Sequence, residues 1–134
     1  MNSRIRILSI NIGLKSDLGG LLTLLTVHRL DLVLMQEVRI TDEQINQQLG
    51  KHGFTGMVNI DAEDQLKPGT ALAWRSTLPL KQVSSVVPCR VQHAFLGSYS
   101  ILNIYAPSGS NKRVERGLFF ARELFHVFSI GSSP

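Results

Sequence analysis

The stretch that decides the fold is Leu30-Asp31-Leu32-Val33-Leu34-Met35-Gln36-Glu37-Val38-Arg39-Ile40. Its apolar run, residues 32–35, is bounded by polar residues, which is typical of a strand buried on both faces of a covered sheet. Glu37 then lies where this strand leaves the core, and open α/β sheets bind ligands outside the carboxyl ends of their strands. Its carboxylate is therefore either an ion-pair partner for a basic side chain or a ligand for a hard cation.

The residues before this strand predict the rest of a βαβ unit. Residues 4–12 are β-branched and apolar, which predicts a strand with Asn11 at its carboxyl end. Residues 18–28 place leucines at helical spacing, and Ser16 or Asp17 can cap this helix. A strand, a helix and a strand within about thirty-five residues predict two parallel strands joined by a right-handed crossover.

The remaining elements predict a mixed sheet. A helix is expected at 41–49, followed by strands at 54–60 and 70–74, a turn at 76–79, and strands at 90–96 and 99–105. Gly97-Ser98 is a hairpin turn between the last two strands, and Asn111 can cap a final helix. The predicted fold class is α/β, with one mixed parallel and antiparallel sheet and helices packed on its outer face.

Composition and charge indicate a globular domain with a basic half. The chain has 134 residues, 43% of them hydrophobic, and a net charge of +4. Residues 1–66 carry 6 basic and 8 acidic side chains, giving −2, whereas residues 67–134 carry 8 basic and 2 acidic ones, giving +6. A basic half suits a polyanion such as nucleic acid, or it is a solvated basic face.

Cysteine usage and hydropathy place the chain in a reducing compartment. Cys89 is the only cysteine, which excludes a disulfide framework and a thiolate zinc site and suggests a small apolar filler. No apolar run resembles a signal peptide or approaches the ~18 residues that a membrane span needs. We therefore expect a soluble intracellular protein.

Three polar side chains fall at the ends of predicted strands: Asn11, Glu37 and Tyr105. A carboxylate, an amide and a phenol on one rim of a sheet suit Mg²⁺ holding a phosphate, because Mg²⁺ needs only one or two protein carboxylates beside the substrate phosphate. Taken singly, Asn11 can be a strand cap and Tyr105 a half-buried aromatic.

Four motifs in order carry a resemblance to a known family. They are Ser9-Ile10-Asn11-Ile12-Gly13, Leu34-Met35-Gln36-Glu37-Val38-Arg39, Gly69-Thr70-Ala71-Leu72 and Leu102-Asn103-Ile104-Tyr105-Ala106-Pro107. Over nearly all of residues 4–128 the chain resembles the endonuclease/exonuclease/phosphatase superfamily. Within it, the chain looks most like the apurinic-endonuclease-like domain of LINE-type (non-LTR) retrotransposons.

The resemblance implies a Mg²⁺-dependent phosphodiesterase that nicks DNA, with Mn²⁺ as an alternative cofactor and the nucleus as its location. By the same resemblance, Glu37 binds the metal, Asn11 helps to hold the metal and the phosphate, and Tyr105 contacts the scissile phosphate. Arg113 and Arg116, at the start of the last predicted helix, either contact the nucleic-acid backbone or form a solvated face.

The chain also departs from the family pattern. The family continues with a Gly-Asp-x-Asn strand and ends with a Ser-Asp-His triplet, and neither occurs here. We therefore expect residues 1–128 to be the N-terminal half of such a domain, one lobe of a four-layer α/β sandwich, followed by an irregular tail at 129–134. This half is expected to be truncated and catalytically impaired.

Two other functions stay open from the sequence. One is a non-catalytic nucleic-acid-binding or interaction fragment, which would self-associate through a sheet face left uncovered. The other is a generic nucleotide-binding βαβ protein, which the turn after the first strand disfavours because it lacks Gly-x-Gly-x-x-Gly and Gly-Lys-Ser/Thr.

Overall fold

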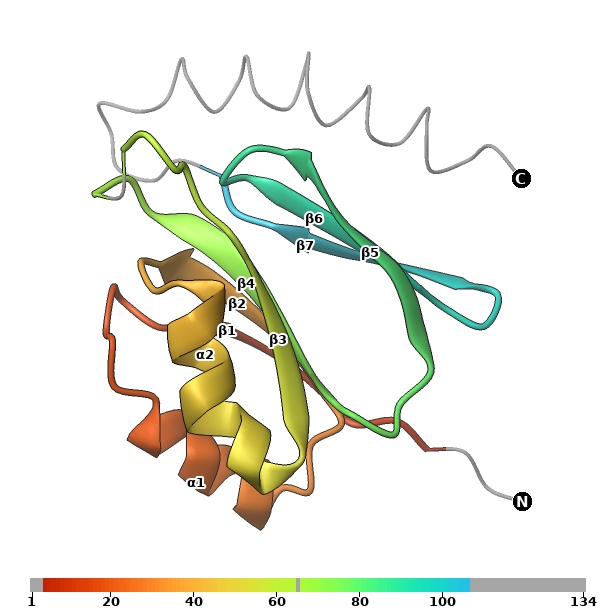
Figure 1. Ribbon diagram of the computed structural model, residues 1–134. Helices are drawn as coiled ribbons and strands as arrows, with labels where there is room; N and C mark the ends of the chain where they lie inside the picture. The colour runs from red at the N-terminus through yellow and green to blue at the C-terminus, as the bar shows by residue number, and fades with distance from the viewer. Residues whose placement is uncertain (1–3, 65, 107–134) are drawn as a thin grey trace.

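The computed structural model describes residues 4–64 and 66–106, which form two packed sheets and two helices (Figure 1). The elements are β1 (Ile7–Asn11), α1 (Gly19–Val27), β2 (Leu32–Val38), α2 (Asp42–Leu49), the 3-10 helix η1 (Gly50–His52), β3 (Phe54–Asn59), β4 (Gly69–Arg75), β5 (Leu80–Val87), β6 (Val91–Leu96) and β7 (Tyr99–Ile104). Among the described residues, no helix is long and apolar enough to cross a membrane.

The first sheet has the strand order β1-β2-β4-β3. β1 and β2 are parallel, whereas β4 is antiparallel to both β2 and β3, so the predicted mixed sheet is confirmed. Both helices cover one face, where the fully buried Val33 and Met35 of β2 pack against leucines of α1 and Ile45 of α2. The apolar run of β2 thus sits between two covered faces, as its sequence predicts.

The helix termini follow local sequence signals. Thr41 and Gln44 form a capping box at the start of α2, with each side chain bonded to the other residue's backbone N–H. The start of α1 differs from the prediction. The N-cap position is Leu18, whose side chain makes no capping hydrogen bond, and the predicted cap Asp17 lies one residue earlier, where its Oδ1 accepts the Gly19 N–H at 2.9 Å.

The second sheet is antiparallel, with the order β5-β6-β7, and it stacks on the inner face of the first sheet. Leu32 of β2, Leu72 of β4 and Ala94 of β6 form the core between them. The hairpin strands therefore do not extend the first sheet sideways, and the inner face that we expected to be uncovered is covered over β2 and β4. Among the described residues of this face, Ile7 of β1 stays 49% accessible.

β5 was not predicted from the sequence. Its pairing with β6 is irregular between Lys81 and Ser84 and again between Ser85 and Val87, and Gln82 has a left-handed φ of 54°. Such bulges insert extra residues, so the partly buried side chains recur at every third position instead of alternating. The period-2 signal that identifies a strand is thereby lost.

Several predicted features lie outside the described residues. They are the last helix from Asn111, the two basic residues Arg113 and Arg116, and the tail at 129–134.

His93 on β6 is buried, and its surroundings favour the neutral imidazole. Its ring meets the ring of Phe95 edge to face, with 4.5 Å between centroids. Within the described part of the chain, the buried Nε2 atom has no hydrogen-bond partner. Burial lowers the pKa of the His93 imidazole below its ordinary value of 6.5, because a charged ring would lose its hydration.

A substitution at Gly69 tests the packing of β4 on β3. A Cβ at this position would meet the carbonyl oxygen of Asn59 closer than real Cβ atoms approach, so Gly69→Ala should lower the free energy of unfolding by about 1–3 kcal/mol. Gly20→Ala is the matched control, because its Cβ would enter open space in α1 and should stabilise the fold by up to about 1 kcal/mol. Urea denaturation measures both, and equal effects would contradict this packing.

The pH dependence of stability tests the burial of His93. The unfolded chain binds a proton near the ordinary pKa of 6.5, whereas folded His93 binds it only at lower pH. The stability that the neutral ring contributes is therefore complete above the unfolded-state pKa of 6.5, and it is lost as the pH falls from there through the lower pKa of folded His93.

His93→Leu should reduce the fall in unfolding free energy between about pH 7 and pH 5, whereas the exposed control His52→Gln should leave it unchanged. Denaturation curves at several pH values measure this, and an undiminished pH dependence in His93→Leu would count against it.

Candidate metal and phosphate site

The carboxyl ends of β1 and β2 meet on one rim of the first sheet. Asn11 lies in register with Gln36, the residue before Glu37. The chain that leaves β1 stays bonded to β2: the Ile12 N–H donates to Gln36 O at 3.0 Å, and the Leu14 N–H donates to Glu37 O at 2.8 Å. The structure thus places Asn11 and Glu37 on neighbouring strand ends of the same rim.

Glu37 occupies a β-bulge in a left-handed conformation. The register of β2 against β4 shifts between Gln36 and Val38, and Glu37 has φ 54°. A non-glycine residue in this region costs about 1–3 kcal/mol and persists where the surrounding structure holds it, most often at functional sites. The Glu37 side chain is half-buried, and the structure gives its carboxylate no hydrogen bond or ion pair within residues 4–64 and 66–106. The bulge therefore holds a carboxylate at the rim without giving it a protein partner.

Asn11 is oriented by the turn that follows it. Its Oδ1 accepts the Gly13 N–H at 2.9 Å, and Gly13 and Leu14 have φ values of 61° and 65°. This turn leaves one lone pair of the amide oxygen and the two Nδ2–H donors for other partners. The oxygen of the exposed amide can therefore coordinate a cation, and its Nδ2–H groups can donate to a phosphate oxygen.

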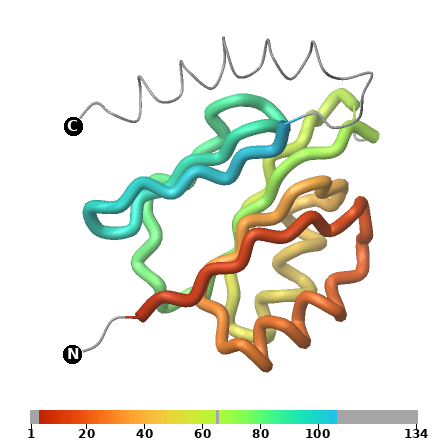
Figure 2. The backbone as a smooth tube through the Cα atoms, turned by 180° about the vertical axis from the view of Figure 1, so that it is seen from behind, coloured from red at the N-terminus to blue at the C-terminus, as the bar shows by residue number. Residues whose placement is uncertain are grey.

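Tyr105 directly follows β7. Its N–H donates to Arg90 O at 2.8 Å, and the Arg90 guanidinium carbon lies 5.5 Å from the centroid of its half-buried ring. Figures 1 and 2 show the carboxyl ends of β1, β2 and β7 at the same end of the molecule. The three predicted residues thus share one end, with Tyr105 on the second sheet and the other two on the first.

A buried amide pair connects the two sheets beside this site. Gln36 Nε2 donates to Asn103 Oδ1 at 2.9 Å, and Asn103 Nδ2 donates to Met35 O at 3.1 Å and to Ala71 O at 2.9 Å. Asn103 is fully buried. Asn103 precedes Tyr105 by two residues, and Gln36 precedes Glu37 by one. The hydrogen bond between Asn103 and Gln36 therefore fixes the position of Tyr105 along the strands relative to Glu37.

Sequence analysis missed this amide pair. Its only signal was an uncharged amide inside a strand of apolar residues, at a position where alternation places the side chain against the core. A second buried amide acts in a similar way at the β5–β6 turn: Asn59 Nδ2 donates to Val87 O at 3.0 Å, and the Cys89 N–H donates to Asn59 Oδ1 at 3.1 Å.

Cys89 is fully buried in this turn, in agreement with its predicted role as a small filler. Burial raises the pKa of the thiol, and the nearby Lys67 only partly opposes this effect. A buried neutral thiol is a poor nucleophile, so Cys89 belongs to the packing of the turn.

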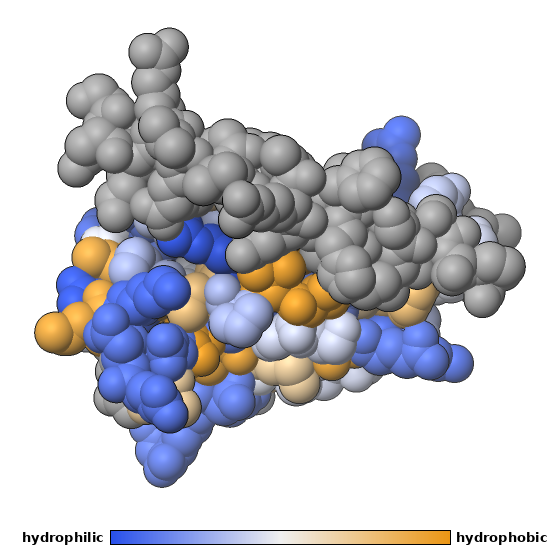
Figure 3. All heavy atoms as spheres, turned by 90° about the horizontal axis from the view of Figure 1, so that it is seen from above, coloured by the Kyte–Doolittle hydropathy of each residue, from blue (hydrophilic) through white to orange (hydrophobic). Residues whose placement is uncertain are grey.

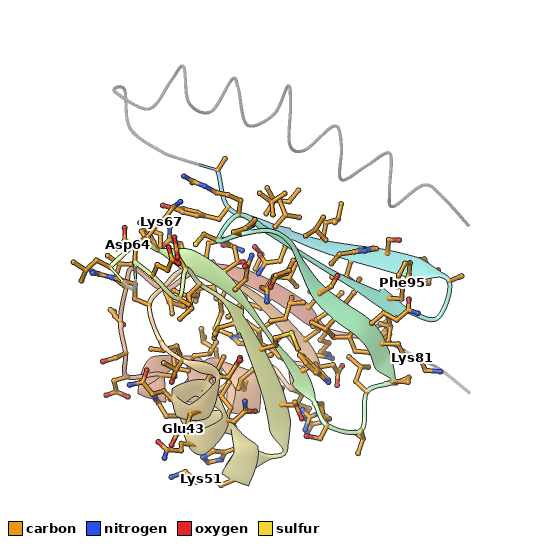
Figure 4. All side chains as sticks on the ribbon, turned by 45° about the horizontal axis from the view of Figure 1, so that its top comes forward. Glu43, Lys51, Asp64, Lys67, Lys81 and Phe95 are labelled. Atoms are coloured by element: carbon orange, nitrogen blue, oxygen red, sulfur yellow. The ribbon has the colours of Figure 1, made fainter. Side chains whose placement is uncertain are left out.

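Exposed charged side chains surround the rim. Lys67 and Asp64 lie together in the β3–β4 loop, where the Lys67 N–H donates to Asp64 O at 3.1 Å (Figure 4). Hydrophilic side chains gather over one corner of this end, beside apolar ones (Figure 3). Lys15 and Arg39 follow Asn11 and Glu37 within four residues, so positive charge flanks both strand ends.

The donors at this end fit a weakly held Mg²⁺. Glu37 supplies a carboxylate and Asn11 an amide oxygen, which are the hard ligands that Mg²⁺ prefers. The described residues contain no cluster of three or more His, Cys, Asp or Glu that could hold a metal alone. A cation at this rim would therefore take its remaining ligands from water and from a bound phosphate.

A hollow of about 780 Å³ adjoins this rim, between the end of β1 and the start of α1. Asn11, Lys15 and Asp17 line it together with leucines of α1, whereas Glu37 does not. The carboxylate thus lies on the open rim and not inside a closed cavity, which suits a large substrate better than a small enclosed one.

No family model matches the sequence, and no curated protein does. Solved structures do match the fold. An AP endonuclease from Archaeoglobus fulgidus has a TM-score of 0.72 at 20% identity, over 92% of this chain and 50% of its own. TDP2 from D. rerio, complexed with a single-strand DNA product, has a TM-score of 0.62 at 18% identity, over 99% and 57%. The AP endonuclease LMAP from Leishmania major has a TM-score of 0.60 at 13% identity, over 83% and 43%.

The chain spans about half the length of these structures. It has the fold that they share, which is the endonuclease/exonuclease/phosphatase-like fold of AP endonucleases and TDP2.

Proposed function

We propose that the rim formed by Asn11, Glu37 and Tyr105 binds a divalent cation together with a phosphate of a DNA backbone. The observation that carries this proposal is the position of Glu37: a half-buried carboxylate without a partner among residues 4–64 and 66–106, held on a left-handed bulge at the carboxyl end of a central strand. A protein that maintains such strain around an unpaired carboxylate favours a ligand at that point.

Each residue has a separate role in this proposal. Glu37 binds Mg²⁺, or Mn²⁺ as an alternative, and Asn11 contributes its amide to the cation and the phosphate. Tyr105 donates its hydroxyl proton to a phosphate oxygen from the second sheet. When bound, the cation neutralises negative charge on the phosphate. Arg113 and Arg116, outside the described residues, are proposed to contact the nucleic-acid backbone.

The activity we propose belongs to the phosphodiesterase class, as a nuclease of the LINE-type retrotransposon kind that would act in the nucleus. AP endonucleases and TDP2, which have this fold, support the DNA-processing class. Hydrolysis also needs a base for the attacking water and donors for the developing charge. The 134 residues contain no Gly-Asp-x-Asn and no Ser-Asp-His to supply these groups. We therefore propose that this chain, as half of the domain, binds cation and phosphate but cleaves poorly.

The alternative function is a non-catalytic fragment that binds nucleic acid or another protein chain. The +6 charge of residues 67–134 favours nucleic acid in this case as well. A cation requirement separates the two functions, because binding through the basic half alone would not need Glu37.

Binding of Mn²⁺ tests the proposed site. Glu37→Gln should weaken Mn²⁺ binding in calorimetry by more than about tenfold, because it removes the carboxylate that we assign to the cation. Glu43→Gln is the matched control, since Glu43 is an exposed carboxylate on α2. Nicking of supercoiled plasmid by the parent chain should stay near background with either metal. Equal Mn²⁺ affinity in the two variants would refute the site, and robust nicking lost only in Glu37→Gln would refute the impaired activity.

The amide pair gives a second test. Asn103→Leu removes the buried hydrogen bonds that the Asn103 side chain makes to Gln36, to Gln92 and to the carbonyls of Met35 and Ala71, which should cost about 2 kcal/mol or more of unfolding free energy. Mn²⁺ affinity should fall as well, since Glu37 loses its positioning. Gln47→Leu on the exposed face of α2 is the control and should change neither quantity. An Asn103→Leu protein that is destabilised but binds Mn²⁺ normally would show that the pair serves the fold alone.

A further inference from the structure

Two of the four sheet edges are protected against pairing with another strand. At β3, the Asn46 side chain takes the place of a neighbouring strand: its Oδ1 accepts the Gly56 N–H and its Nδ2 donates to Gly56 O, both at 2.9 Å. Asp42 Oδ1 accepts the Val58 N–H at 2.7 Å. At β5, the bulges and the exposed Lys81 disrupt the edge. Both are devices by which proteins avoid unwanted strand pairing.

Within residues 4–64 and 66–106, the other two edges, β1 and β7, have no neighbouring strand. Arg6 O accepts the Leu32 N–H, and the Ile12 N–H donates to Gln36 O, so the even-numbered residues of β1 bond to β2. Backbone groups alternate in direction along a strand, so those of Ile7, Ser9 and Asn11 point away from the sheet. In β7 the Tyr105 N–H donates to Arg90 O, which leaves the backbone groups of Ser100, Leu102 and Ile104 pointing outward. No strand among the described residues pairs with either edge.

The open edges lie on one side of the sandwich and form a step. Figure 2 shows β1 and β7 together on the near side. β7 packs over β2 and β4, so the first sheet extends one strand, β1, beyond the second sheet. On the inner face of this protruding strand Ile7 is 49% accessible and is followed by the exposed Ser9 and Asn11, and Ile5, just before the strand, is 39% accessible. This side of the molecule, which we call the stepped side, therefore has β1 protruding from the first sheet and the edge of β7 recessed in the second sheet.

We propose that this stepped side binds a second copy of the chain. β7 runs along β2 in the same sense: the carboxyl ends of both strands lie at the same end of the molecule (Figures 1 and 2), where Asn103 bonds to Gln36. Rotation by a two-fold axis parallel to the strands exchanges the two layers and keeps the strand direction. The protruding β1 of each copy then fills the recess beside β7 of the other, as an added parallel strand in that sheet.

The shape of this side favours a second copy over an unrelated partner. A stepped edge is complementary to itself under this rotation, as a two-fold interface requires, and it places the exposed Ile7 opposite Ile7 of the other copy. The proposal does not depend on a bound cation.

Sedimentation equilibrium tests this proposal on the full chain. The parent protein should give twice the monomer mass of 14.9 kDa and dissociate on dilution. Ile7→Lys should give the monomer mass, because it places two positive charges against each other across the axis. Val27→Lys is the matched control: it adds the same charge to an apolar residue that is 67% exposed on α1, away from the step, and should stay dimeric. Circular dichroism shows whether each variant is folded.

Cross-linking tests the same geometry without adding charge. A short bis-maleimide should join two copies of Ile7→Cys but not of Val27→Cys, and the fully buried Cys89 should not react. A parent chain that stays monomeric, or a dimer that Ile7→Lys leaves intact, would overturn the proposal. So would cross-linking of Val27→Cys in preference to Ile7→Cys.

Discussion

The hydrogen bond between the Asn103 and Gln36 amides is the constraint on which the rest of the candidate site depends. It joins β7 to β2 across the two sheets at 2.9 Å, beside the apolar core formed by Leu32, Leu72 and Ala94. A buried amide that is left unpaired costs about 1–3 kcal/mol, so these two strands have one favoured register against each other. Apolar packing alone would allow the sheets to slide, because it has no direction.

This register matters because the site residues belong to different sheets. Glu37 follows Gln36 by one residue, and Tyr105 follows Asn103 by two. The bulge at Glu37 and the Asn11 turn then bring the carboxylate and the amide to the rim of the first sheet. Stability and binding thus depend on the same interaction: the Asn103–Gln36 hydrogen bond connects the two sheets, and it also positions the side chains that we propose to hold a cation and a phosphate.

Much of this organisation follows from local sequence signals. The run around β2 and the helical spacing of leucines in α1 predict elements that the structure contains, because each signal depends only on nearby residues. Asn11, Glu37 and Tyr105 were identifiable as strand-end residues for the same reason. The stacking of β5–β7 on the inner face was not predictable, since a hairpin can extend a sheet or cover it with the same alternating pattern.

Two failures have a more specific cause. β5 was missed because its bulges replace alternation by a spacing of three. The Asn103 pair was missed because its partner is 67 residues away in the sequence, and nothing near either residue indicates the other. The left-handed conformation of Glu37 was likewise invisible, since a glutamate carries no local preference for it.

The most direct measurement of the central claim is paramagnetic broadening of backbone amide signals by substoichiometric Mn²⁺ in NMR spectra. The account predicts that broadening begins at residues 11–14 and 36–38 and at Tyr105, three segments distant in the sequence. Broadening that begins instead at Asp42 and Glu43, or along the acidic β3–β4 loop, would contradict it. The cation would then follow exposed charge and not the rim that the two sheets build together.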